Sequence, residues 1–204
     1  MGMSKVLERA GAAHMGTNRD IHAGHDDLHA RYRQTCELWS DRRVEIIDGR
    51  IVVRELPTFN HATIVYRLLL QLIPFLTEQD WVAAFDLKVF LGLHEDRYRP
   101  DITITRSSPQ MWDAEHVHSD DTLLVVEVVS PSSAKDDHEI KARNYAKGHV
   151  PLYLVIDPFE QVARLLSHPT ESGYEQETTE ALGKPLELPS PWEVTLDTAK
   201  LTAS

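Results

Sequence analysis

The sequence has little of what several protein classes require. Cys36 is the single cysteine among 204 residues, which excludes an internal disulfide framework and a metal site built from clustered cysteines. Basic residues are also in deficit, since 21 Lys and Arg stand against 32 Asp and Glu and give a net charge of −11. That balance argues against a histone-like protein that binds nucleic acid through bulk positive charge, although it leaves room for a local basic groove.

Long apolar runs and phosphate-binding loops are missing as well. No apolar run approaches the roughly 18 residues that a membrane span needs, and the N-terminus has no apolar signal core. We therefore expect a cytoplasmic protein without a membrane partner. The sequence has no Gly-x-Ser-x-Gly, no Gly-rich phosphate loop and no Gly-x-Gly-x-x-Gly, so common hydrolase and nucleotide-binding motifs are excluded.

What is present indicates one α/β domain. We expect a loosely docked tail over residues 1–30, a folded domain over 31–190 and a C-terminal tail over 191–204. β-branched runs flank Asp48-Gly49, a pair that favours a tight turn between antiparallel strands. Residues 61–77 carry apolar side chains at helical spacing, with Asn60 as the expected N-cap and Pro74 as an end or a kink.

A strand–helix–strand unit follows later in the chain. Residues 123–129 are almost unbroken apolar, which is typical of a strand buried on both faces. Residues 135–147 are expected to form a helix, and residues 152–156 form a second apolar strand. Such a unit joins parallel strands. The sequence therefore predicts a mixed sheet in which these two strands are central and parallel.

Glu127 is the most informative residue because it interrupts the apolar strand. A lone ionised carboxylate buried there would cost several kcal/mol or would bind a proton, so a metal ion or a lysine is expected beside it. The alternative is a glutamate at the strand's end with its carboxylate in water.

Two further acids, Asp101 and Glu45, are candidate site residues because of their positions. Asp101 opens an apolar strand that precedes the Glu127 strand, although Pro100-Asp101 alone would be read as a turn. Two carboxylates on adjacent strands repel each other, and Mg²⁺ or Mn²⁺ would relieve the repulsion. Glu45 lies within the first strand of the hairpin, where the solvent face is an equally good position for an acid.

Lys141 lies on the expected helix and shares a face with Asp137 and Tyr145. An exposed ion pair between Asp137 and Lys141 is the ordinary interpretation. Beside a metal ion and a phosphate, the same lysine could orient the attacking water or stabilise negative charge.

Taken together in their order along the chain, these acids, the lysine and their flanking segments resemble the Uma-type putative restriction endonuclease family. The resemblance spans about residues 35–180 and rests on segments that follow one another along the chain: Glu45-Ile46-Ile47-Asp48-Gly49, Pro100-Asp101, Val126-Glu127-Val128-Val129-Ser130-Pro131-Ser132, Asp137, Lys141, Tyr145 and Val150-Pro151-Leu152-Tyr153-Leu154-Val155-Ile156-Asp157-Pro158. The family belongs to the PD-(D/E)xK nuclease superfamily. The resemblance implies a restriction-endonuclease-like mixed β-sheet flanked by helices, with an antiparallel N-terminal hairpin.

The resemblance also implies the site. Glu45, Asp101, Glu127 and Lys141 would be catalytic, with Asp101 and Glu127 as ligands of Mg²⁺ or Mn²⁺. A plain (D/E)xK motif would place the lysine two residues after Glu127, where Val129 stands, so the resemblance moves the lysine to the following helix. The implied activity is metal-dependent endonuclease cleavage of nucleic acid, DNA rather than RNA. The alternative is a catalytically inactive nuclease-fold module that binds nucleic acid or protein.

Further expectations concern the surroundings of the site. His61 and Gln71 lie on the early helix and could face it. A homodimer is predicted because the chain has more large aromatics than a small core holds: Trp81, Phe85, Phe90, Trp112 and Trp192. The candidates for a basic rim that contacts nucleic acid are Arg42, Arg43, Arg97, Arg99, Lys135, Lys141, Arg143 and Lys147.

Overall fold

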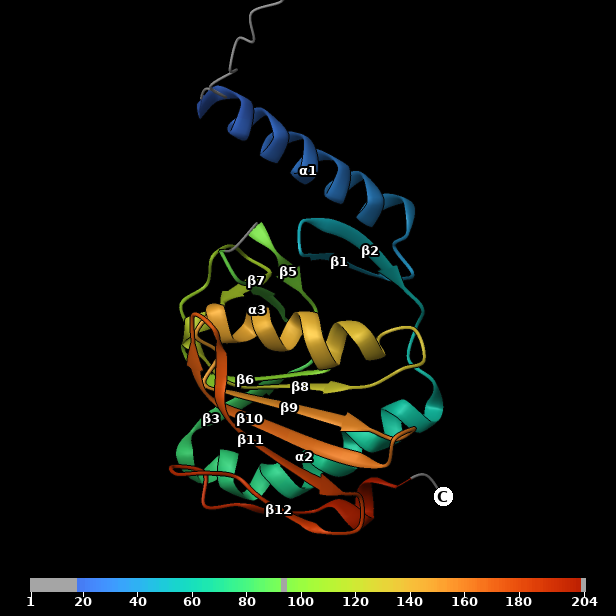
Figure 1. The fold of residues 1–204 in the computed structure, drawn as a ribbon, viewed down its shortest axis with the longest axis vertical. Coiled ribbons are helices and arrows are strands. Elements are labelled where there is room, and N and C mark those ends of the chain that lie inside the picture. Colours follow the sequence, from blue (N-terminus) through green and yellow to red (C-terminus); the bar gives the residue numbers. More distant parts are fainter. Residues whose placement is uncertain (1–17, 93–94, 203–204) are drawn as a thin grey trace, which may run out of the picture.

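Three β-sheets and three α-helices make up the computed structural model of the chain, which describes residues 18–92 and 95–202, with the backbone alone for 18–26 (Figure 1). The six-stranded sheet has the order β11 (Gly173–Ala181), β10 (Val162–Thr170), β9 (Leu152–Asp157), β8 (Thr122–Val128), β6 (Ile102–Arg106) and β3 (Trp81–Ala84). The five-stranded sheet has the order β2 (Arg50–Arg54), β1 (Arg43–Ile47), β5 (Arg97–Tyr98), β4 (Lys88–Phe90) and β7 (His116–His118). β12 (Pro185–Glu187) pairs with β13 (Thr195–Asp197).

The central strands of the larger sheet are β8 and β9, and they run parallel as the sequence predicts. The connection between them begins with a π-helical segment, Asp136–Lys141, and continues as α3 (Ala142–Lys147). In Figure 1 this connection covers one face of the sheet and α2 (Phe59–Gln79) covers the other. Val126 and Val128 pack on the α2 side, whereas Val125 and Val129 pack on the α3 side. The prediction of a mixed sheet with flanking helices is confirmed.

The N-terminal hairpin is also confirmed. β1 and β2 pair antiparallel around Asp48 and Gly49, whose φ values of 53° and 70° fit a tight turn. The buried carboxylate of Asp96 accepts hydrogen bonds from the backbone N–H groups of Asp48 (2.8 Å) and Gly49 (2.9 Å). This contact fixes the hairpin against the segment that leads to Asp101.

Helix α2 differs in its ends from the sequence prediction. Thr58, and not Asn60, is the N-cap, because its side chain accepts a hydrogen bond from the His61 N–H. Pro74 does not end the helix, which continues to Gln79. Pro74 and Leu70 are both exposed, so the Leu70 carbonyl that loses its partner can bond to water.

None of the helices over the described residues combines the length and apolarity that a membrane crossing needs.

The chain ends contribute more structure than the predicted tails suggest. α1 begins at Asn18 rather than near residue 31, and its Tyr32 packs against β1. Residues 1–17 of the predicted N-terminal tail lie outside the described residues. At the other end, Trp192, Leu196 and Leu201 are buried in the main core. The segment after residue 190 therefore belongs to the domain, because its apolar side chains pack in the same core as the buried face of α2.

The structure removes part of the argument for a homodimer, because several of the aromatic residues contact one another within the chain. Trp192 is buried against Trp81, with ring centroids 5.0 Å apart, and Phe90 stacks on Trp112 at 4.3 Å. Phe85 and Trp112 remain exposed. The dimer stays a prediction: light scattering at micromolar concentration should give twice the 23.2 kDa mass of one chain. A mass equal to that of one chain would contradict it.

Candidate active site

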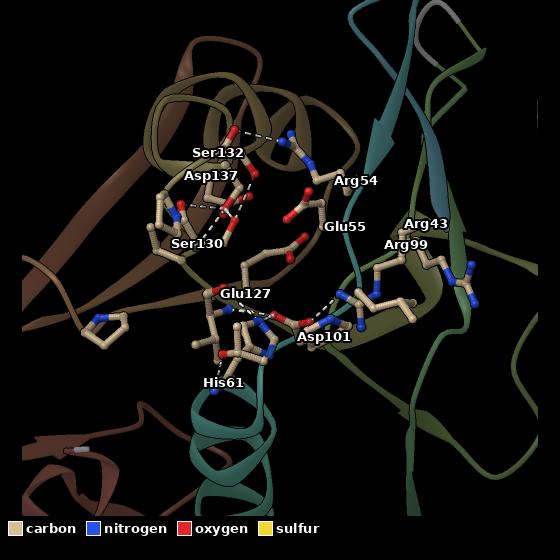
Figure 2. Close-up of a pocket in the computed structure, with 18 of the residues that line it drawn as sticks. Arg43, Arg54, Glu55, His61, Arg99, Asp101, Glu127, Ser130, Ser132 and Asp137 are labelled. Atoms are coloured by element: carbon tan, nitrogen blue, oxygen red, sulfur yellow. Dashed lines mark hydrogen bonds and ion pairs between the residues drawn. The ribbon is translucent and has the colours of Figure 1, made fainter. Parts of the chain in front are cut away.

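The four residues singled out from the sequence line one cavity of about 490 Å³ (Figure 2). Glu45 comes from β1, Asp101 directly precedes β6, Glu127 lies near the end of β8, and Lys141 ends the π-helical segment. The Asp101 N–H donates to the Val126 carbonyl (3.1 Å), which holds the start of β6 beside the end of β8. The predicted proximity of these residues in space is therefore found in the structure.

Strand alternation explains how a lysine on a helix reaches the Glu127 carboxylate. Glu127 points to the same face of β8 as Val125 and Val129, which pack under α3. Lys141 Nζ lies 2.8 Å from Glu127 Oε1, 3.3 Å from Glu45 Oε1 and 3.2 Å from Asp137 Oδ1. Its side chain is 3% exposed, so the interpretation as an exposed ion pair is wrong. Val129, two residues after Glu127, is buried in the apolar cluster under α3.

The carboxylate of Glu127 is held in an unusually charged environment. It is buried and accepts hydrogen bonds from Lys141 and, at 3.3 Å, from the Tyr145 hydroxyl. Burial raises the pKa of Glu127 well above 4.5, Lys141 opposes this, and the neighbouring carboxylates add to it. Burial alone would lower the pKa of Lys141, but the surrounding carboxylates outweigh it and raise that pKa well above 10.5. The single ammonium of Lys141 therefore faces three carboxylates, those of Glu127, Glu45 and Asp137.

Asp101 lies in a different environment, with three polar or cationic partners (Figure 2). Arg43 Nη1 donates to its Oδ1 at 2.6 Å, while the Val128 N–H donates to Oδ2 at 2.8 Å. His61 Nε2 lies 3.0 Å from the same Oδ2. Burial favours the neutral acid, but His61, Arg43 and the Val128 N–H outweigh it and lower the pKa of Asp101. These three contacts therefore stabilise the ionised form of the Asp101 carboxyl.

Of the two α2 residues predicted to face the site, one lies at the cavity and the other does not. His61, in the first turn, reaches Asp101 and also lies 3.0 Å from the Val128 carbonyl. Gln71 lies further along the helix and accepts a hydrogen bond from the Asp197 N–H at 2.7 Å, away from the cavity. Of these two sequence candidates, only His61 belongs to the site.

Arg54 is a site residue that the sequence reasoning missed. Its Nε donates to Glu45 Oε2 at 3.2 Å, and its guanidinium also bonds to the Ser132 carbonyl and Asp136. Arg54 lies opposite Arg43 in the hairpin register. The sequence contained a signal for Arg54, because Arg43 and Arg54 lie opposite each other at the open end of the hairpin that carries Glu45.

The candidates for a basic rim are only partly placed at the cavity. Arg43, Arg99 and Lys141 line it. Arg97 does not: its guanidinium lies 5.2 Å from the Tyr32 ring centroid and 4.8 Å from that of Trp112. Because both rings cover Arg97, it supports the packing of α1 and is removed from the rim.

The two acids predicted as metal ligands differ in how far their oxygens are already hydrogen-bonded. Over the described residues, no group of three or more His, Cys, Asp or Glu side chains forms a ready metal site. Both hydrogen bonds to the Glu127 carboxylate use Oε1, which leaves Oε2 available to a ligand. Carboxylate oxygens are the ligands that Mg²⁺ and Mn²⁺ take. Both Asp101 oxygens already accept hydrogen bonds, Oδ1 from Arg43 and Oδ2 from the Val128 N–H, so a cation would replace one of these contacts.

Comparisons with known proteins show the family and the fold of the chain. A family model described as putative restriction endonuclease, Uma2, matches residues 29–199. The crystal structure of a putative nuclease belonging to DUF820 from Anabaena variabilis is similar in fold, with a TM-score of 0.61 and 18% identity over 78% of this chain and 88% of that chain. No curated protein matches the sequence. Because the family match covers most of the chain, the protein belongs to the Uma2 family of putative restriction endonucleases.

Proposed function

We propose that the protein is a metal-dependent endonuclease that hydrolyses phosphodiester bonds in nucleic acid, with DNA as the substrate rather than RNA. The observation that carries the proposal is the convergence of Glu45, Asp101, Glu127 and Lys141 in one cavity. Membership of the Uma2 family supports nuclease activity in general. The cofactor proposed is Mg²⁺ or Mn²⁺.

Each residue has a distinct role in this proposal. Asp101 and Glu127 would hold the metal ion, which when bound polarises the phosphate and lowers the pKa of a water molecule. Lys141 orients the carboxylates of Glu127 and Glu45, and its ammonium can stabilise charge on the scissile phosphate. Glu45 would position the attacking water or accept its proton.

A cleavage assay tests the proposal. Plasmid DNA, single-stranded DNA and RNA are incubated with Mg²⁺ or Mn²⁺, using the wild type and Glu127→Ala. We expect the wild type to cleave DNA with either ion and to be inactive in chelator, and Glu127→Ala to be inactive throughout. Glu187→Ala, which removes an exposed glutamate from β12, is the matched control and should remain active.

The alternative is an inactive nuclease-fold module. It is favoured by the cations that already pair with the acids, since Arg43 bonds to Asp101 and Lys141 bonds to Glu127. If no substrate is cleaved with either ion, while nucleic acid or protein still binds, this alternative replaces the endonuclease.

The raised pKa of Glu127 predicts a pH dependence of metal binding. A proton on Glu127 competes with the cation, and burial raises the pKa of this carboxyl well above 4.5. The affinity for Mn²⁺ should therefore rise as the pH increases above about 5, because fewer Glu127 carboxyls then carry the competing proton. Calorimetric titration at several pH values measures this change. An affinity that does not vary over this range would contradict the assignment of Glu127 as a ligand.

A further inference from the structure

The charges around the cavity limit how a nucleic acid can be bound there. The cavity is lined by four cationic side chains, Arg43, Arg54, Arg99 and Lys141, and by five acidic ones, Glu45, Glu55, Asp101, Glu127 and Asp137. The chain as a whole carries −11. Binding through many phosphate contacts requires an excess of Lys and Arg. In the absence of the metal ion, affinity for a polyanion at this cavity therefore needs another source.

An apolar rim offers that source. Leu56 and Phe159 line the cavity, yet they are 62% and 60% exposed. Among the described residues that line it, Phe159 is the one Phe, Tyr or Trp. Phe159 stacks on no other ring in the described part of the chain. Its ring is therefore free to stack on a ligand.

The backbone that carries Phe159 is fixed by a buried acid. Asp157 Oδ1 accepts hydrogen bonds from the N–H groups of Phe159 (2.8 Å) and Glu160 (2.9 Å). Asp157 Oδ2 lies 2.7 Å from His138 Nε2, and Arg164 bonds to the other nitrogen of that imidazole. The backbone of this turn is therefore ordered before a ligand binds, which reduces the backbone entropy lost on binding.

The turn also lies close to the acids of the site. Phe159 follows the end of β9, and β9 pairs in parallel with β8, where Glu127 lies opposite Val155. The Val129 N–H donates to the Ile156 carbonyl at 2.9 Å, which continues this pairing to the cavity. Because Glu127 and Phe159 line the same cavity, a nucleotide whose phosphate lies beside the acids can bring its own base, or the next one, to the rim.

From these observations we infer that Phe159 stacks on an unpaired nucleobase beside the scissile phosphate, so that the substrate is DNA with unpaired bases at the cleavage position. The inference rests on the proposed function. In a duplex both faces of each base are covered by neighbouring base pairs, so an aromatic side chain has no free face to contact. Stacking tolerates any base and adds affinity without further positive charge.

Binding measurements in chelator test the inference without any contribution from cleavage. Fluorescence anisotropy compares a fluorescein-labelled oligothymidylate with an abasic oligonucleotide of the same length, which keeps the phosphates and lacks the bases. The wild type should prefer the oligothymidylate by about tenfold, the order expected for one base on an aromatic ring. Phe159→Ala should reduce this ratio to about one, and Phe159→Trp should retain it. Tyr66→Ala, which removes an equally exposed ring (60%) from the outer face of α2, should also retain it.

The outcomes separate this inference from the proposed function. Equal or undetectable binding of the two oligonucleotides by the wild type overturns the stacking role, as does tighter binding of a blunt duplex of the same length. If the preference is found and no substrate is cleaved with Mn²⁺, the stacking role stands and the endonuclease fails. If DNA is cleaved without the preference, the endonuclease stands and the stacking role fails.

Discussion

Lys141→Met should lower the free energy of unfolding by about 3–5 kcal/mol near pH 8, the cost typical of removing one partner from a buried ionic cluster. The ammonium lies within 3.3 Å of three carboxylates, those of Glu127, Glu45 and Asp137, all of them buried. Methionine keeps most of the volume and removes the charge, so these carboxylates would repel one another without compensation. Urea denaturation of both proteins in chelator measures the difference.

The sign of the pH dependence follows from the same cluster. Without Lys141, the pKa of Glu127, already raised by burial, rises further in the folded state but not in the unfolded state. The folded variant then binds more protons than the unfolded chain above about pH 5, so its stability falls as the pH rises. The deficit relative to the wild type should therefore be smaller at pH 5 than at pH 8.

A matched control is Lys200→Met. Lys200 is 66% exposed and pairs with Asp197 at 3.2 Å. Removing it should change the free energy of unfolding by about 1 kcal/mol or less, as is usual for surface ion pairs. Equal effects of the two substitutions, or a Lys141→Met deficit that does not depend on pH, would contradict the buried cluster.

Glu127→Gln should abolish cleavage while the fold is retained. The loss should be about a thousandfold or more, since a catalytic metal ion contributes several kcal/mol to the transition state. In chelator the variant should be as stable as the wild type or more stable, because the amide removes one of several crowded carboxylates. Lys141 keeps Glu45 and Asp137 as counter-charges, at 3.3 and 3.2 Å.

Melting curves with and without Mn²⁺ complete this test. Mn²⁺ should raise the melting temperature of the wild type, because a ligand of the folded state stabilises it by mass action. The gain should be much smaller for Glu127→Gln. If Glu127 served only as a structural partner of Lys141, Gln would destabilise the protein in chelator and Mn²⁺ would shift neither curve.

The sequence was sufficient for the parts of the site that local patterns determine. An acid inside an unbroken apolar strand signals a buried charge with a partner, and Glu127 has Lys141 at 2.8 Å. The Asp-Gly turn predicts the hairpin that brings in Glu45. The strand–helix–strand order predicts parallel β8 and β9, which places Lys141 above the end of β8.

Other features depend on contacts between distant segments. Trp192 lies in a stretch without strong periodicity, and it is buried because Phe75 and Trp81 form a pocket for its ring. The sequence alone predicts Arg97 as a surface charge, yet two aromatic rings cover it. Arg54 reaches Asp136 and Ser132 across 82 and 78 residues of chain. No local pattern encodes such pairings.

Titration of Mn²⁺ monitored by electron paramagnetic resonance tests the central claim most directly. The wild type should remove Mn²⁺ from its free hexa-aqua signal, and Asp101→Ala and Glu127→Gln should each lose most of that binding, while Glu187→Ala keeps it. Binding of Mn²⁺ by the wild type that both site variants retain, or no binding by any of the proteins, would show that these acids do not form a metal centre.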